Sequence, residues 1–103
     1  MAYGVVIDVD APLEVYDALH AAVLETTQST MDGLLLHVGR VSGTGFQVIE
    51  VWTDRAQFDR YNEQVVWPAA ARLEQGGMSV PQPSRTDEFE VRGLVLPGVR
   101  LVR

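Results

Sequence analysis

The chain has 103 residues with fourteen acidic and eight basic side chains, and it contains neither cysteine nor lysine, so arginine supplies every basic group. These absences exclude thiol nucleophiles, disulfides, cysteine-ligated metals, lysine Schiff bases and the phosphate-binding lysine of a P-loop. The net charge of −6 argues against nucleic acid or an anionic membrane surface as a partner, because both attract basic faces.

The length is that of one domain, which we expect to span residues 1–103. The first residues lack the basic and then apolar pattern of a secretory signal. No apolar stretch approaches the ~20 residues that a transmembrane helix needs. We therefore expect a cytoplasmic protein that has no membrane segment.

The first half of the chain predicts a strand, a helix and a hairpin. Residues 3–9 are short and β-branched, which is typical of a buried strand. Pro12 is tolerated in the first turn of a helix, and apolar residues at helical spacing extend this helix to about Glu25. Two apolar runs, 34–41 and 46–53, are separated by a glycine-rich segment, and this arrangement indicates a β-hairpin.

The second half predicts another helix and a last strand. Asp54 and Gln57 have the spacing of a helix N-terminal cap. We expect Pro68 to break or kink this helix, and a short helix over 69–74 to follow. Residues 88–92 alternate polar and apolar side chains, as an edge strand does. Residues 93–103 are expected to form a C-terminal arm, either an extra strand or a segment that crosses to a partner.

The predicted order is strand, helix, strand, strand, helix, strand. This βαββαβ order is typical of a ferredoxin-like α+β domain, in which helices cover one face of a four-stranded antiparallel sheet. The other face would leave apolar side chains in water. A symmetric homodimer is therefore the expected arrangement.

The hairpin register assigns side chains to the two faces of the sheet. A two-residue loop would pair Val41 with Phe46, and it would then place His37 opposite Glu50 and Leu35 opposite Trp52. The opposite face would be purely aliphatic, with Leu36, Val38, Ile49 and Val51. We expect the aliphatic face to pack on the helices and the face of His37 to line a cavity.

His37 and Glu50 form the acid–base pair that this register brings together. A carboxylate beside an imidazole orients the ring and raises its basicity, which suits proton abstraction. The alternative is structural, with two polar side chains that satisfy each other or lie at a dimer seam. The pair supplies only two metal ligands, so we expect no metal site. His20 is interpreted as a boundary residue of its helix, and Tyr16, Tyr61 and Trp67 are read first as packing residues.

Short hydrophobic motifs carry a resemblance to a known family. These are Gly-Leu-Leu-Leu-His-Val at 33–38, Gly-Phe-Gln-Val-Ile-Glu-Val-Trp at 45–52, Phe-Asp-Arg-Tyr at 58–61 and Trp-Pro-Ala at 67–69. Together they resemble the antibiotic biosynthesis monooxygenase-like group of dimeric α+β barrel proteins, over residues 3–92. The resemblance implies two ferredoxin-like subunits whose sheets close into a barrel. It also implies a pocket between sheet and helices or inside the barrel.

The resemblance implies a chemistry as well. Some members oxidise aromatic polyketides or quinols with molecular oxygen and without metal or flavin, while others cyclise polyketides, degrade haem or have no assigned activity. On this basis we expect no cofactor and a small aromatic or polyketide-like ligand. His37 would be the base with Glu50 behind it, and the substrate-binding residues would be Trp52, Phe46, Leu35, Tyr61 and Trp67. A polyketide cyclase or isomerase and a non-catalytic binding or accessory protein stay open as alternatives.

Overall fold

The computed structural model describes residues 2–27 and 31–96. Its elements, in chain order, are β1 (Tyr3–Val9), α1 (Leu13–Thr27), β2 (Leu34–Ser42), β3 (Gly45–Trp52), α2 (Arg55–Tyr61), η1 (Asn62–Val66), α3 (Trp67–Gln75) and β4 (Arg85–Glu90). The predicted α+β order is confirmed. Residues 93–96 belong to no regular element, and the remainder of the expected C-terminal arm, 97–103, lies outside the described residues.

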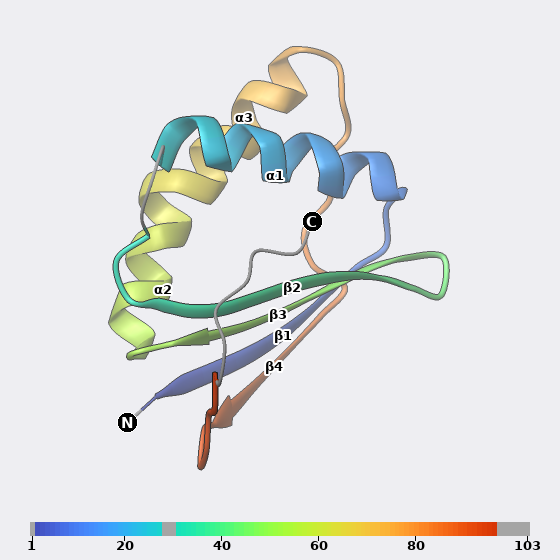
Figure 1. The fold of residues 1–103 in the computed structure, drawn as a ribbon. Helices are drawn as coiled ribbons and strands as arrows, with labels where there is room; N and C mark the ends of the chain where they lie inside the picture. Colours follow the sequence, from blue (N-terminus) through green and yellow to red (C-terminus); the bar gives the residue numbers. More distant parts are fainter. Residues whose placement is uncertain (1, 28–30, 97–103) are drawn as a thin grey trace.

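The four strands form one antiparallel sheet in the order β2-β3-β1-β4. The first strand of the chain therefore lies in the interior of the sheet, between β3 and β4. All three α-helices lie over the same face of this sheet, as Figure 1 shows. This is the predicted ferredoxin-like arrangement.

The hairpin between β2 and β3 has the expected register over most of its length. Ser42 pairs with Gly45 across a two-residue loop, where Gly43 has a φ of +58° that suits glycine. His37 consequently pairs with Glu50. The expected pairing of Leu35 with Trp52 is wrong. A bulge between Leu34 and Leu36 adds a residue to β2, so Leu34 pairs with Trp52 instead.

The expected assignment of the two sheet faces is also wrong. The helices pack on the face of His37, Glu50 and Trp52, and within residues 2–27 and 31–96 no helix covers the aliphatic face. Two apolar clusters fill the space under the helices: one is built on Val5, Trp52 and Phe58, and the other on Ala11, Val15 and Phe46. Aromatic side chains remove more apolar surface from water than the aliphatic residues of the other face, and this favours packing their face against the helices.

The helix after β3 continues through Pro68 without the expected break. Asp54 caps α2 by accepting a hydrogen bond from the Gln57 backbone N–H at 2.9 Å. The backbone N–H of Trp67 then donates to the carbonyl of Asn62, five residues back, which is the wider π-helical turn of η1. Pro68 lies in the first turn of α3, where a missing N–H is tolerated, so the chain stays helical to Gln75.

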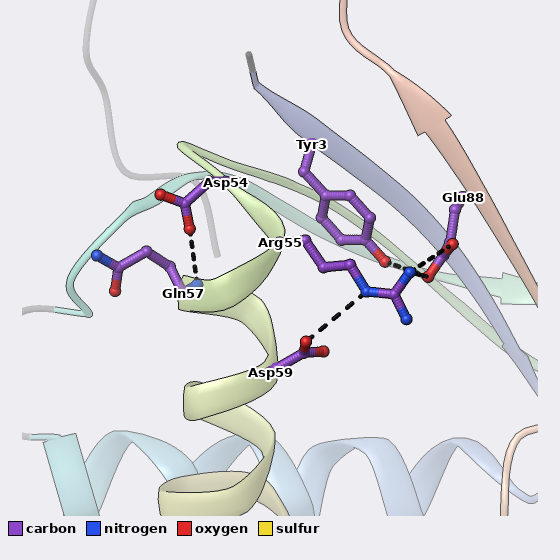
Figure 2. A network of polar contacts seen from close by, with 6 residues as sticks. All are labelled: Tyr3, Asp54, Arg55, Gln57, Asp59 and Glu88. Carbon is purple, nitrogen blue, oxygen red and sulfur yellow. Dashed lines mark hydrogen bonds and ion pairs between the residues drawn. The ribbon is translucent and has the colours of Figure 1, made fainter.

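Polar contacts fasten the start of α2 to the far edge of the sheet (Figure 2). The guanidinium of Arg55 lies 3.2 Å from Glu88 on β4 and 3.7 Å from Asp59 on its own helix. The hydroxyl of Tyr3 donates to the same Glu88 carboxylate at 2.8 Å. Burial, reinforced by the Glu88 carboxylate, raises the pKa of the Tyr3 phenol above its ordinary value of 10.0. These contacts are exposed and contribute little to the free energy of folding. We infer that they orient α2 relative to the edge of the sheet.

Candidate functional site

A chain of polar side chains runs through the space between the sheet and the helices. Glu50 is its centre: one carboxylate oxygen lies 2.7 Å from Nδ1 of His37, and the other accepts a hydrogen bond from Nε1 of Trp52 at 3.1 Å. The other ring nitrogen of His37, Nε2, lies 2.9 Å from the hydroxyl of Tyr16. Tyr16 comes from α1, so this network joins a helix to both strands of the hairpin.

The network lies between the two apolar clusters of the core. Glu50 is only 3% exposed, and Trp52 is fully buried. An ionised carboxylate in such surroundings costs several kcal/mol unless it is paired and hydrogen-bonded. Both oxygens of Glu50 are engaged, and no buried side-chain nitrogen or oxygen within the described residues lacks a partner. The site is therefore a satisfied polar group built into the core.

The hydrogen bonds assign the protons of the network. The Trp52 indole can only donate, so Glu50 accepts from it, and the carboxylate can also accept from Nδ1–H of His37. With Nδ1 protonated, Nε2 of the neutral imidazole accepts the hydroxyl proton of Tyr16. Glu50 thereby holds His37 in the tautomer whose basic nitrogen points away from the carboxylate and toward α1.

Aromatic rings surround the polar atoms. Tyr16 stacks with His20 at a centroid distance of 5.4 Å and meets the edge of Phe46, also at 5.4 Å. His20 in turn lies 5.6 Å from the ring of His37. At the other end of the network, the Trp52 ring lies 4.9 Å from Tyr61. The imidazole is thus held in an environment from which rings exclude most of the water.

The two tyrosines of the site stay protonated at neutral pH. Burial raises the pKa of Tyr16 above its ordinary value of 10.0, and the charges of Glu50 and Asp17 add to this effect. Burial also raises the pKa of Tyr61, with the Glu50 charge as the next cause. Both hydroxyls are therefore neutral groups that can donate a hydrogen bond next to the carboxylate.

A pocket of about 250 Å³ lies beside the Trp52 end of the network, and His37, Glu50 and Tyr16 are not among its lining residues. Its inner wall includes Trp52 and Tyr61, and its rim carries the polar side chains of Gln57, Arg60 and Gln64. A second hollow of about 440 Å³ lies beside Tyr3, Arg55 and Glu88, whose polar groups are already bonded to one another. The aromatic wall makes the first pocket the better candidate for a flat organic ligand.

The structure brings five of the seven expected site residues together. His37, Glu50 and Trp52 share one network, Phe46 packs on Tyr16, and Tyr61 packs on Trp52. Leu35 lies at the β2 bulge and is 39% exposed, and Trp67 is 58% exposed at the start of α3. Neither of these two residues takes part in the network or in the ring contacts around it.

Two site residues were not expected from the sequence. Tyr16 was interpreted as a packing residue and His20 as a boundary residue, yet their rings lie against His37. The available signal was their spacing of four residues, which places both on one side of a helix. The spacing alone does not place these rings beside His37, because their position also depends on which face of the sheet the helix covers.

Two other kinds of site were searched for within residues 2–27 and 31–96. No cluster of three or more histidine, aspartate or glutamate side chains in this part of the chain has the arrangement of a metal site. In the same residues, no helix combines the length and the apolar character required to span a bilayer.

Comparisons with known proteins identify the fold. No family model and no curated protein matches the chain. Among solved structures, an antibiotic biosynthesis monooxygenase candidate from Chloroflexus aurantiacus J-10-fl superposes with a TM-score of 0.68 at 22% identity, over 95% of this chain and 100% of that one. SnoaB, a cofactor-independent oxygenase from Streptomyces nogalater, gives a TM-score of 0.56 at 19% identity, over 94% and 96% of the two chains.

A third similar structure is a MhuD variant with two manganese protoporphyrin IX molecules bound per active site. It gives a TM-score of 0.52 at 19% identity, over 92% of this chain and 98% of that one. At these identities the likeness establishes architecture and not activity. The chain has the fold of the antibiotic biosynthesis monooxygenase structures, as its sequence motifs indicated.

Proposed function

We propose that this protein is a cofactor-independent monooxygenase that acts on a small aromatic or polyketide-like molecule. The observation that carries the proposal is the contact at 2.7 Å between half-buried His37 and Glu50, which is the one charged residue among the described buried side chains. A few convergent polar groups in otherwise apolar surroundings are typical of ligand-binding and active sites. The fold adds support, because one protein that shares it is a cofactor-independent oxygenase.

The chemistry requires little from the protein beyond a base and a dry space. His37 accepts a proton from an electron-rich phenol or from its keto tautomer, and Glu50 stabilises the imidazolium that forms. The substrate anion passes one electron to O₂, and the two radicals join through a new C–O bond to give a peroxide anion. The imidazolium returns its proton to this anion, and the hydroperoxide then loses water with the hydrogen of the same carbon and leaves a carbonyl, so that one oxygen atom enters the product and the other becomes water.

The surrounding residues suggest how a ligand would be held. Trp52 and Tyr61 offer an aromatic wall in the pocket beside the network, and Phe46 packs on Tyr16, whose hydroxyl contacts His37. The polar rim suits hydroxyl or carbonyl groups at the outer edge of a flat ring system. Leu35 and Trp67, which were expected to bind substrate, are not part of this proposal because both are well exposed.

One observation favours a non-catalytic function instead. All buried polar atoms of the site satisfy one another, so the network could serve only to define the packing of the core. A protein of this kind would bind an aromatic ligand and leave it unchanged.

Oxidation of dithranol, a tricyclic dihydroxyanthrone, tests the proposal. We expect the protein to accelerate O₂ uptake over buffer and to place one atom of isotopically labelled O₂ in the quinone. His37→Ala should lower kcat by about 10²- to 10⁴-fold, because it removes the base. Its melting temperature should fall, because buried Glu50 loses a hydrogen-bond donor, while sedimentation and dithranol affinity should stay close to those of the unchanged protein.

Arg40→Ala is the matched control, because Arg40 lies on the same strand but projects from the uncovered face. It should leave turnover unchanged. Dithranol binding without any acceleration would contradict the enzyme and support the accessory protein. Loss of the fold in His37→Ala would show that the pair is structural, and ring closure of a linear polyketide without O₂ uptake would support a cyclase.

We also propose that the protein is a cytoplasmic homodimer. The sheet face opposite the helices, with Leu36, Val38 and Ile49, supports the dimer, since Val38 is 40% exposed there and a small domain gains from burying apolar surface. The cytoplasmic location stays a prediction from the sequence, and cell fractionation would test it.

A further inference from the structure

We propose that the hydroxyl of Tyr16 carries the proton between the substrate and His37, which makes Tyr16 a second catalytic residue. This inference rests on the proposed oxygenase function. The geometric reason is that both nitrogens of His37 are already engaged: Nδ1 lies 2.7 Å from Glu50, and Nε2 lies 2.9 Å from Tyr16. A substrate cannot reach the base without either displacing Tyr16 or passing its proton through it.

The Tyr16 oxygen has the capacity for this transfer. It donates its proton to Nε2, and a phenol oxygen that donates can still accept a hydrogen bond through a lone pair. A substrate hydroxyl can therefore bond to this oxygen while the bond from Tyr16 to His37 stays intact. Displacement of Tyr16 would instead break a formed hydrogen bond inside a space of low dielectric constant.

The backbone is shaped to keep Tyr16 in place. Gly39 on β2 lies directly under the Tyr16 ring, and a methyl group at this position would collide with ring atoms and with the hydroxyl oxygen. His20 stacks on one side of the same ring, and the edge of Phe46 contacts it on another. A hydroxyl held by contacts from α1, β2 and β3 is preorganised for proton transfer.

Exposure shows where a substrate would approach. The Glu50 side chain is 4% exposed, whereas that of His37 is 24% exposed and Tyr16 is half-buried. The accessible end of the network is therefore the end that carries Tyr16. Glu50 is less accessible than either His37 or Tyr16.

The step is balanced in atoms and charge. The O–H bond of the substrate breaks and its proton moves to the Tyr16 oxygen, while the original Tyr16 proton moves to Nε2 of His37. The products are a substrate anion, a neutral Tyr16 and an imidazolium that Glu50 stabilises. On the return path, the same two transfers deliver a proton to the product. No tyrosinate accumulates, in agreement with the phenol staying protonated at neutral pH.

Dithranol turnover by three variants tests this role. Tyr16→Phe removes the hydroxyl and should lower kcat at least tenfold with little change in KM. Gly39→Ala keeps the hydroxyl but moves it, and it should also lower kcat. Tyr3→Phe is the matched control, because it removes the hydroxyl of a tyrosine that bonds to Glu88 outside the site, and it should leave kcat unchanged.

Fluorotyrosine at position 16 separates proton transfer from positioning. Fluorine lowers the pKa of the phenol and barely alters its size, so a transferring hydroxyl should change kcat in step with that pKa. A hydroxyl that only orients His37 should leave kcat constant across the series, and this result would overturn the proposal. Unchanged kcat in Tyr16→Phe would also overturn it.

The same measurements distinguish a failure of the proposed oxygenase function from a failure of the proton-transfer role of Tyr16. If the unchanged protein does not accelerate dithranol oxidation, the oxygenase and the transfer step both fall. If the unchanged protein and Tyr16→Phe turn over equally while His37→Ala is inactive, the oxygenase stands and the substrate binds directly to Nε2.

Discussion

Glu50 occupies a position between Val48 and Trp52 where an apolar side chain would satisfy the packing of the core. Its carboxylate is tolerated because the Trp52 indole and the His37 imidazole both point at it, at 3.1 and 2.7 Å. Removal of either donor would leave a buried oxygen unpaired, which typically costs about 1–3 kcal/mol and more for a charged group. Each residue of the network thus depends on the others, and single substitutions should be interpreted together with the melting temperature.

Tyr61 makes stability depend on alkaline pH. Burial and the Glu50 charge raise the pKa of its phenol above 10.0 in the folded protein. Below that pH the phenol is protonated in both states, so its contribution to the free energy of unfolding is constant. As the pH rises further, the unfolded chain loses this proton first, and stability falls toward the folded pKa.

The Tyr61→Phe variant removes that titration. We expect it to lose less stability than the unchanged protein between about pH 9 and pH 11, measured by urea unfolding at each pH. Tyr3 and Tyr16 also have raised pKa values, so part of the alkaline loss should persist. Near neutral pH the two proteins should differ little, and this comparison is the internal control. Parallel curves for the two proteins would contradict the assignment to Tyr61.

Sequence reasoning could find the pair in the site but not its third member. His37 and Glu50 are close in the chain and are joined by a two-residue turn, so their pairing follows from local geometry. Tyr16 reaches them from a helix that is distant in sequence, and its contact depends on a long-range choice between two sheet faces. Gly39 is a local sequence signal for the contact with Tyr16, since a glycine in a strand often marks the close approach of another group.

At the scale of elements, the α2 cap offers a direct measure of helix stability. Asp54→Ala removes the acceptor for the Gln57 backbone N–H, and we expect it to lower the free energy of unfolding by about 1 kcal/mol. Urea unfolding at neutral pH would measure this.

Asp59→Ala is the control, because it removes the same charge from the same helix without affecting the cap. The Asp59 carboxylate is half exposed and lies 3.7 Å from Arg55, so its loss should cost less than about 0.5 kcal/mol. Equal effects of the two substitutions would show that charge rather than capping is responsible.

Hydrophobic patterns within single segments predicted where the strands and helices lie. They did not predict the irregularities inside those elements. The bulge near Leu35 and the π-turn before Trp67 each add one residue to a regular repeat; Pro68 signalled an irregularity at the second but not its form, and no glycine or proline signalled the first. Both shifts turn a residue that was expected in the site toward solvent. The position of a bulge or a π-turn depends on tertiary packing, so it cannot be predicted from the local propensities of the residues.

For the whole molecule, the uncovered sheet face predicts the assembly state. Val38 is 40% exposed on this face, and Val38→Asp would place a charge in the proposed dimer interface. We expect the unchanged protein to sediment as a dimer and the variant to shift to monomers.

Leu24→Asp provides the comparison, since Leu24 is 48% exposed but lies on α1, on the helical side of the molecule. This variant should remain dimeric. A monomeric unchanged protein at micromolar concentration would contradict the proposal.

The interior position of β1 has a consequence for how the chain folds. The β2–β3 hairpin closes across two residues and can form as soon as both strands exist, whereas Tyr3 on β1 pairs with Trp52 on one side and with Glu90 on the other. Such distant pairings carry most of the loop-closure entropy and slow the folding of a sheet. β1 precedes both of its neighbours in the chain, so its apolar residues stay open to other chains until β4 arrives to close the outer edge.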